Sequence, residues 1–220
     1  MVDSILVMGS IDRDELVTAC RIAFELAGAP QVAAAWDTES ACAGMTVGGL
    51  THHLVSQVRH LDTLLSRPPE AEPPIALLDH YGRADWVDAG ADDEANTSIR
   101  DGDNQAAGVG PAAVLAAVEP FFQTLPTRLD ATRVPDTVLI PWQGWSVTTD
   151  DFLVIRAMEL VVHSDDLAAS VGLTTPEFPA SVVAHVVRLL TGVAMRRHGQ
   201  TAIVRALSRP QRAPASVSAF

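Results

Sequence analysis

The sequence predicts a mainly α-helical protein with little or no β-strand, in which long helices pack around one core. Apolar residues recur three to four positions apart over several long segments, which is the period of a helix with one buried face. Stretches rich in proline and glycine separate most of these segments. Only residues 137–142 (TVLIPW) have the composition of a short extended run. With 220 residues, 48% of them hydrophobic, the chain is long enough to bury such a core.

The first predicted helix begins after Asp12, which is expected to be its N-cap, with Glu15 as the partner in a capping box. Gly28 and Pro30 are expected to end this helix. Residues 31–44 then predict a loop with a short turn.

Thr46 is expected to cap a second long helix that ends before the prolines at 68–69. On a helical wheel His53 borders the apolar face, whereas His52 faces outward. His60 lies two turns beyond His53, about 10 Å along the helix axis. That separation is too large for the two imidazoles to share one ion, but it allows His60 to line a pocket beneath the ion.

The middle of the chain is less regular. Residues 67–74 predict an exposed proline-rich connection, and residues 75–87 a further helix. Residues 88–110 are rich in Asp, Asn and Gly, and they allow two interpretations: the start of a third bundle helix, or a cover over a site. Residues 110–129 predict a helix that Pro120 kinks.

The end of the chain predicts two more helices. After the short extended run, Trp142 and Trp145 are expected either to wall a cleft or to pack in the core. One helix is expected to begin after Pro179, and a shorter one to cover residues 200–207. The remaining residues are predicted to be a tail. The apolar surface of these last helices is compatible with a homodimer.

The segment 148–172 carries the candidate chemistry. As a helix it places Glu159, His163 and Asp166 on one narrow face, while its other faces are apolar. Such a helix is expected to be enclosed, so its charged face points into the protein. A buried carboxylate and imidazole are costly unless they pair or hold a cation. The sequence therefore predicts either a salt-bridged network or a metal site.

A metal site on this helix needs a third ligand from another helix, and His53 is the candidate. Two imidazoles and a carboxylate suit zinc, iron(II), nickel or manganese and leave coordination positions open. Asp166 is expected to bond to a ligand or to act as a cap rather than to bind the metal. Arg156, about one turn before Glu159, is expected either to meet a substrate carboxylate or to form an ordinary ion pair.

Composition excludes several classes of function. The net charge of -12 argues against binding to nucleic acid or to an anionic membrane surface. All 15 basic residues are arginine, which excludes a Schiff-base lysine and a Walker lysine. Cys20 and Cys42 have neither metal-site nor redox spacing, as expected in a reduced cytoplasm. Residues 1–9 lack the features of a signal peptide, and no apolar run approaches the ~20 residues of a membrane span. We therefore expect a cytoplasmic protein.

Two distant stretches carry a resemblance to a known family. MTVGGLTHHL at 45–54, taken with MELVVHSDDLAASVG at 158–172, resembles the DinB-like metal-binding four-helix bundles, and most of all the mycothiol-dependent maleylpyruvate isomerase group. The IPWQGW stretch at 140–145 adds to it. The resemblance implies a DinB-like four-helix bundle over residues 1–172, with one or two appended helices and a tail over 173–220. Characterised isomerases of the group carry a separate α/β portion there.

The resemblance also implies a ligand set. In that family the metal ligands are the His of a T-V-x-x-L-x-x-H-L pattern together with the Glu and His of an E-x-x-x-H-x-x-D-L-A pattern. These patterns fall on His53, Glu159 and His163. The helical wheel selects His53 over His52 independently. Zinc is the first expectation, with another divalent metal allowed. The residues expected around the ligands are Asp166, Gln57, His60, Trp142, Trp145 and Arg156.

The function that the resemblance implies is thiol chemistry. Mycothiol, or another low-molecular-weight thiol, would be the co-substrate and would be activated as a thiolate at the open position of zinc. The thiolate would add to a small electrophile, for isomerisation or S-transfer. The lysine-free composition fits a GC-rich actinobacterium, and actinobacteria make mycothiol. The alternatives are a non-catalytic metal-containing ligand-binding or sensor protein, and a helical protein in which Glu159 and His163 simply pair.

Overall fold

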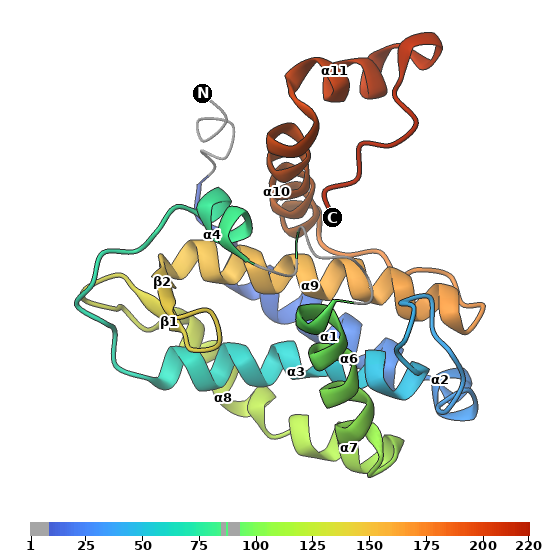
Figure 1. The fold of residues 1–220 in the computed structure, drawn as a ribbon. Helices are drawn as coiled ribbons and strands as arrows, with labels where there is room; N and C mark the ends of the chain where they lie inside the picture. Colours follow the sequence, from blue (N-terminus) through green and yellow to red (C-terminus); the bar gives the residue numbers. More distant parts are fainter. Residues whose placement is uncertain (1–8, 85–86, 88–92) are drawn as a thin grey trace.

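The computed structural model describes residues 9–84, 87 and 93–220, and within them the protein is mainly helical, as predicted (Figure 1). The only strands among these residues form one small antiparallel pair. The helices that form or flank the bundle are α1 (Arg13–Ala27), α2 (Pro30–Ala34), α3 (Val47–Ser66), α4 (Leu77–Arg83), α6 (Glu94–Ala107), α7 (Pro111–Val118), α8 (Phe121–Asp130) and α9 (Thr149–Ser170). They are followed by α10 (Ala180–His198), α11 (Gln200–Ser208) and a 3-10 turn, η2 (Pro210–Arg212).

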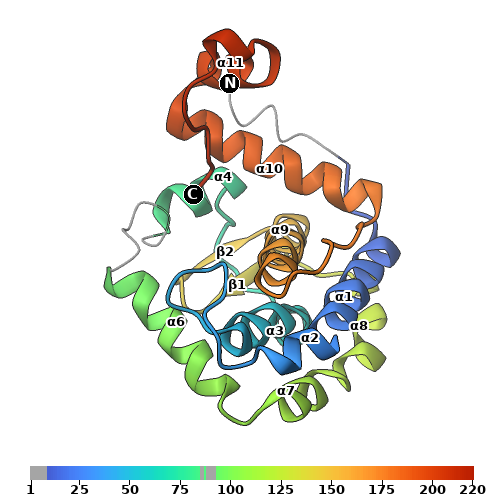
Figure 2. The ribbon, with the colours of Figure 1, turned by 90° about the vertical axis from the view of Figure 1, so that its right-hand side faces the viewer.

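Helix α3 lies at the centre of the molecule. It packs against α1, α6, α8 and α9, and α9 in turn packs against α1 and α10. Figure 2 shows α9 nearly end-on, between α3 on one side and α10 on the other. Most of the apolar side chains of α9 are buried, from Phe152 to Ala168. The helix is therefore enclosed as its apolar faces predicted, and its polar face must look toward its neighbours.

Two predicted helix caps are confirmed. The side chains of Asp12 and Thr46 each accept a hydrogen bond from the backbone N–H three residues later, and Thr148 caps α9 in the same way. The predicted capping box at Asp12 is wrong in one respect. The carboxylate of Glu15 accepts a hydrogen bond from the Ser181 hydroxyl, so it ties α1 to the start of α10.

Proline explains two further differences from the prediction. Pro30 begins the short helix α2, because the first turn of a helix needs no N–H from its first residue. The single kinked helix expected over residues 110–129 is two helices, α7 and α8, which meet at Pro120. Pro120 has no N–H to donate to the preceding turn, so the hydrogen-bonded ladder of α7 stops before it.

The polar segment 88–110 contains the third long helix of the bundle, α6, so the bundle-helix interpretation of this segment is confirmed. Residues 88–92 lie outside the described part of the chain, as do residues 1–8 of the expected apolar lead. Helix α4 covers the centre of the helix expected at 75–87, and residues 85–86 are not described.

The extended run forms β1 (Val138–Ile140), which pairs antiparallel with β2 (Trp145–Val147). Gly144 in the connecting turn has φ 79°, a backbone conformation that glycine adopts without strain. This hairpin precedes α9 directly and lies beside α3 and α4 in Figure 1. Among the described helices none has, by itself, the length and apolar composition to cross a membrane; only the pair Thr97–Ala107 and Pro111–Asp130, bent by 101°, passes that test.

The residues expected to form a tail return to the body of the protein. The Ala219 side chain is only 9% exposed, and the Phe220 ring lies 5.6 Å from the Tyr81 ring, centroid to centroid. The carbonyl oxygens of Ser218 and Ala219 accept hydrogen bonds from His198 and Arg197 at the end of α10. The chain end therefore packs between α4 and α10.

Candidate metal centre

Helices α3 and α9 bring together the three side chains that the sequence proposed as metal ligands. Nε2 of His53 lies 3.0 Å from Oε2 of Glu159, and Nε2 of His163 lies 3.3 Å from the same oxygen. The potential ligand atoms all lie within 4.8 Å of one another, and the two imidazole rings meet edge to face at 4.9 Å. All three side chains are partly buried. A single divalent cation fits between donors at this spacing.

Asp103 of α6 contacts the ring nitrogen of His53 that does not face Glu159. Its Oδ2 lies 2.8 Å from Nδ1 of His53, and its Oδ1 lies 2.6 Å from Nδ1 of His52. His52, predicted to face outward, is instead covered by α6, because one carboxylate bridges both imidazoles. Burial by itself would raise the pKa of Asp103, but the two histidine hydrogen bonds lower it to about 2. The ionised carboxylate directs the Nδ1 proton of His53 toward itself and leaves Nε2 facing Glu159.

Asp166 bonds to Nδ1 of His163, as Asp103 bonds to Nδ1 of His53. Its Oδ2 lies 3.0 Å from Nδ1 of His163, and it also accepts a hydrogen bond from the Cys42 thiol at 3.3 Å. Cys42 lies in the loop after α2, which a hydrogen bond from Ala41 N–H to the Ser170 hydroxyl fastens to the end of α9. Carboxylates that accept from the outer nitrogen of a ligating histidine fix its tautomer and orientation. The site thus has one such carboxylate for each imidazole.

The charges of the centre are strongly coupled. Burial would raise the pKa of Glu159, but hydrogen bonds from His163 and His53 hold it well below its ordinary value. Burial would lower the pKa of His163, but its bonds to Asp166, Cys42 and Glu159 hold it well above its ordinary value. Without a cation, the centre is therefore a hydrogen-bonded ion network. A metal would have to displace the protons between Glu159 and the imidazoles, so its affinity should fall with acid.

One turn away, the same two helices make a second polar contact. Arg156 donates a hydrogen bond from Nη1 to Oε1 of Gln57 at 2.6 Å, and Nε2 of Gln57 donates to the carbonyl oxygen of His53. Arg156 is buried and bonds to an amide, and among the described residues it does not form the surface or intramolecular ion pair that one interpretation of the sequence expected.

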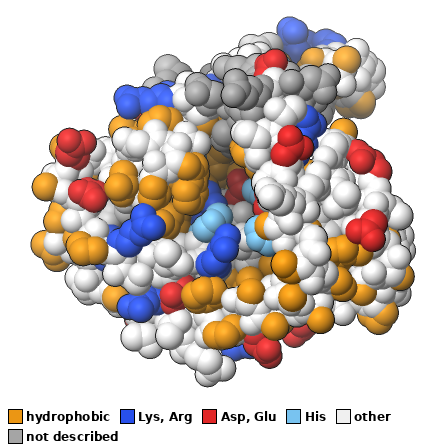
Figure 3. Space-filling view, turned by 60° about the horizontal axis from the view of Figure 1, so that its bottom comes forward, with side chains coloured by type: hydrophobic (Ala, Val, Ile, Leu, Met, Phe, Trp, Pro, Cys, Tyr) orange, Lys and Arg blue, Asp and Glu red, His pale blue; other side chains and the backbone are white. Residues whose placement is uncertain are grey.

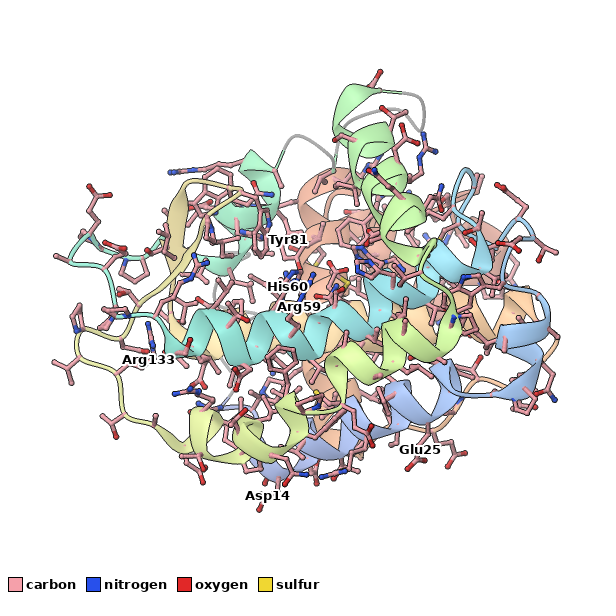
Figure 4. All side chains as sticks on the ribbon, turned by 90° about the horizontal axis from the view of Figure 1, so that it is seen from below. Asp14, Glu25, Arg59, His60, Tyr81 and Arg133 are labelled. Atoms are coloured by element: carbon pink, nitrogen blue, oxygen red, sulfur yellow. The ribbon has the colours of Figure 1, made fainter. Side chains whose placement is uncertain are left out.

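The two tryptophans of the hairpin lie against histidines. Trp145 donates its Nε1 hydrogen to Nδ1 of His80 on α4 at 3.1 Å, and the Trp142 ring lies 5.0 Å from the His60 ring. Trp142 is 54% exposed, so it does not pack in the core. Figure 4 shows His60 and Tyr81 at the same interior region of the molecule, and Figure 3 shows histidine and arginine side chains around a hollow in this face.

The sequence argument did not predict that Asp103, His52 and Cys42 adjoin the centre, nor that His80 bonds to Trp145. Asp103 lies in a mostly polar segment, and nothing in the sequence placed it opposite His53. Cys42 has no metal-site spacing, and its approach to Asp166 depends on how the loop folds back onto α9. The mostly polar, acid-rich character of residues 92–103 was the one available signal that this segment holds more than a linker.

A helical bundle that gathers two imidazoles and a carboxylate from facing helices defines a DinB-like protein of the metal-binding type. Comparison with protein-family models agrees. The model described as the mycothiol maleylpyruvate isomerase N-terminal domain matches residues 17–168, which is more than half of the chain. The chain therefore belongs to this mycothiol-related family. Comparisons with curated proteins and with solved structures found no match.

Proposed function

We propose that the protein is a divalent-metal-dependent enzyme, with zinc as the first candidate metal. It would use a low-molecular-weight thiol such as mycothiol for isomerisation or S-transfer on a small electrophile. The single observation that carries the proposal is the convergence of His53, Glu159 and His163, each imidazole being backed by a carboxylate. Three ligands leave positions open for a small molecule, whereas structural zinc sites are usually closed by four.

The protein's own residues have distinct parts in this proposal. Asp103 and Asp166 hold the Nδ1 protons of the two histidines, so that both Nε2 atoms can act as donors toward one point. Among the three proposed ligands, Glu159 supplies the negative charge that a divalent cation would meet. A bound divalent cation would lower the pKa of a thiol that reaches it, which supplies a nucleophile at neutral pH. The thiol comes from the co-substrate, because Cys42 is engaged with Asp166 and Cys20 is fully buried.

Metal content is the first test. We expect purified wild-type protein to hold about one divalent ion per chain and the His53→Ala variant to lose it. His52→Ala is the matched control, since His52 shares Asp103 with His53 but does not face Glu159. Elemental analysis of the three proteins measures this. If wild-type protein holds no stoichiometric metal after reconstitution with zinc, Glu159 and His163 simply pair and the proposal is wrong.

Turnover is the second test. Wild-type protein loaded with zinc should consume thiol-reactive electrophiles in the presence of mycothiol, and removal of the metal with a chelator should abolish the activity. Activity that survives chelation would contradict the proposal. Tight metal retention without product formation from any thiol would instead identify a ligand-binding or sensor protein.

A further inference from the structure

A second group of potential metal ligands lies on the side of the His163 ring that carries Nδ1. Sγ of Cys42 lies 4.0 Å from Nδ1 of His163 and 3.3 Å from Oδ2 of Asp166, and that oxygen lies 3.0 Å from the same Nδ1. The three residues are half-buried, and their ligand atoms all lie within 4.8 Å of one another. The group shares only His163 with the candidate metal centre, where Nε2 of the ring faces Glu159.

The spacing of these three atoms fits a cation. Their distances define a triangle whose centre lies about 2 Å from every corner, which is close to the length of a bond from zinc to nitrogen or oxygen. The bond from zinc to sulfur is longer, about 2.3 Å, and a small shift away from the thiol, out of the plane of the three atoms, provides it. An imidazole nitrogen, a thiolate and a carboxylate oxygen are all ligands of zinc, whereas magnesium and calcium prefer oxygen alone.

The loop that carries Cys42 is held in place by bonds that do not involve the thiol. On one side of it, Ala41 N–H donates to the Ser170 hydroxyl of α9, and on the other side the Ala43 carbonyl oxygen accepts from Arg100 of α6. A thiol is only a weak hydrogen-bond donor, so its contact with a carboxylate adds little to this attachment. Once it loses its proton, however, a thiol becomes a strong metal ligand. The fixed loop therefore presents a sulfur donor at a defined point beside α9.

We propose that Cys42, Asp166 and Nδ1 of His163 form a second cation site, for a divalent metal that favours sulfur, such as zinc. The inference goes beyond the proposed function and does not depend on it, because neither His53 nor Glu159 takes part. Binding releases the thiol proton of Cys42 and the Nδ1 proton of His163 to solvent. Asp166 changes from the acceptor of that proton to a ligand. With both sites filled, the ring of His163 bridges two cations.

This second site should be the weaker of the two. Its cation must displace both a thiol proton and an imidazole proton, and a dication bound on the Nε2 side of His163 repels it. Purified protein should therefore hold about one ion, and the second should bind only when more metal is added. With only the first cation bound, Asp166 keeps the Nδ1 proton of His163, as in the proposed function.

The test is a titration of the metal-free full chain with cobalt(II), in buffer without added thiol. Cobalt(II) is the probe because its bond to a thiolate gives an intense charge-transfer absorption band in the near ultraviolet, which nitrogen and oxygen ligands do not give. We expect the wild type to develop this band as the second equivalent binds, and Cys42→Ser to lose both the band and that equivalent. Cys20→Ala is the matched control, because it removes the other free cysteine, which is buried elsewhere, and it should keep the band.

Two further variants test the other parts of the assignment. His53→Ala should lose one equivalent but keep the charge-transfer band, because His53 belongs only to the first site. Asp166→Asn should keep the band at saturation, but the cobalt concentration that half-saturates it should rise at least tenfold, because a neutral amide replaces an anionic ligand.

The absorption band decides the second site, and the remaining equivalent decides the first. Absence of the band in the wild type would overturn the proposal, as would a band that survives Cys42→Ser or an unchanged half-saturation in Asp166→Asn. A band lost in His53→Ala would also overturn it, since the thiol would then be binding the first cation. A single equivalent whose band depends on Cys42 but not on His53 would leave the second site and remove the metal centre of the proposed function.

Discussion

Replacing Asp103 with asparagine should weaken metal binding about tenfold to hundredfold. The carboxylate makes two short contacts, 2.6 Å to His52 and 2.8 Å to His53, and its side chain is only 13% exposed. Hydrogen bonds that involve a charged group contribute about 1.5–3 kcal/mol each. Only the bond to His53 acts on a proposed ligand, so one such contribution is lost from metal binding. At about 1.4 kcal/mol for each factor of ten, this gives the expected range.

The assay is competition for zinc between the protein and a chromophoric chelator, at fixed pH and ionic strength. Asparagine keeps the size of the side chain and can still accept a hydrogen bond, so the loss measures the negative charge rather than a cavity. Asp101→Asn is the matched control: it makes the same change on the exposed side of α6, two residues earlier. Zinc affinity that is unchanged in Asp103→Asn, or that falls equally in Asp101→Asn, would refute the assignment of Asp103 as the residue that orients His53.

Two further predictions concern stability. Because burial holds the pKa of His60 at about 3 and that of His80 at about 4, both below the unfolded value of 6.5, the unfolded chain binds more protons in acid. The stability that each of these two histidines contributes should be full above pH 6.5 and fall by about 2 kcal/mol between pH 7 and pH 5. Urea unfolding of wild type and His80→Gln at each pH measures the contribution of His80, and a variant with the same pH profile as the wild type would contradict this. Gly48→Ala should cost about 1–3 kcal/mol, because its Cβ would lie 2.6 Å from the Trp36 ring, and an unchanged melting temperature would disprove that constraint.

The sequence alone determined the helices whose signals are local. Asp12 and Thr46 cap their helices as predicted because an N-cap bond spans only three residues. The spacing of Glu159 and His163 on one face likewise follows from the helix period. The same argument proposed His53 over His52 as the ligand, although its expectation that His52 faces outward was wrong, because α6 covers His52 as well.

Tertiary structure decided what surrounds that face. Asp103 contacts His53 at a sequence separation of 50 residues, and Cys42 contacts Asp166 at a separation of 124. Helix periodicity predicts neither contact. The same is true of Arg156, for which the sequence allowed either an ion pair or a substrate contact. Only the packing of α3 against α9 shows that its guanidinium faces an amide instead of a carboxylate. Short-range hydrogen bonds and helix periodicity depend only on residues close together in the sequence. The partner of a buried charge depends instead on which distant helix packs against it.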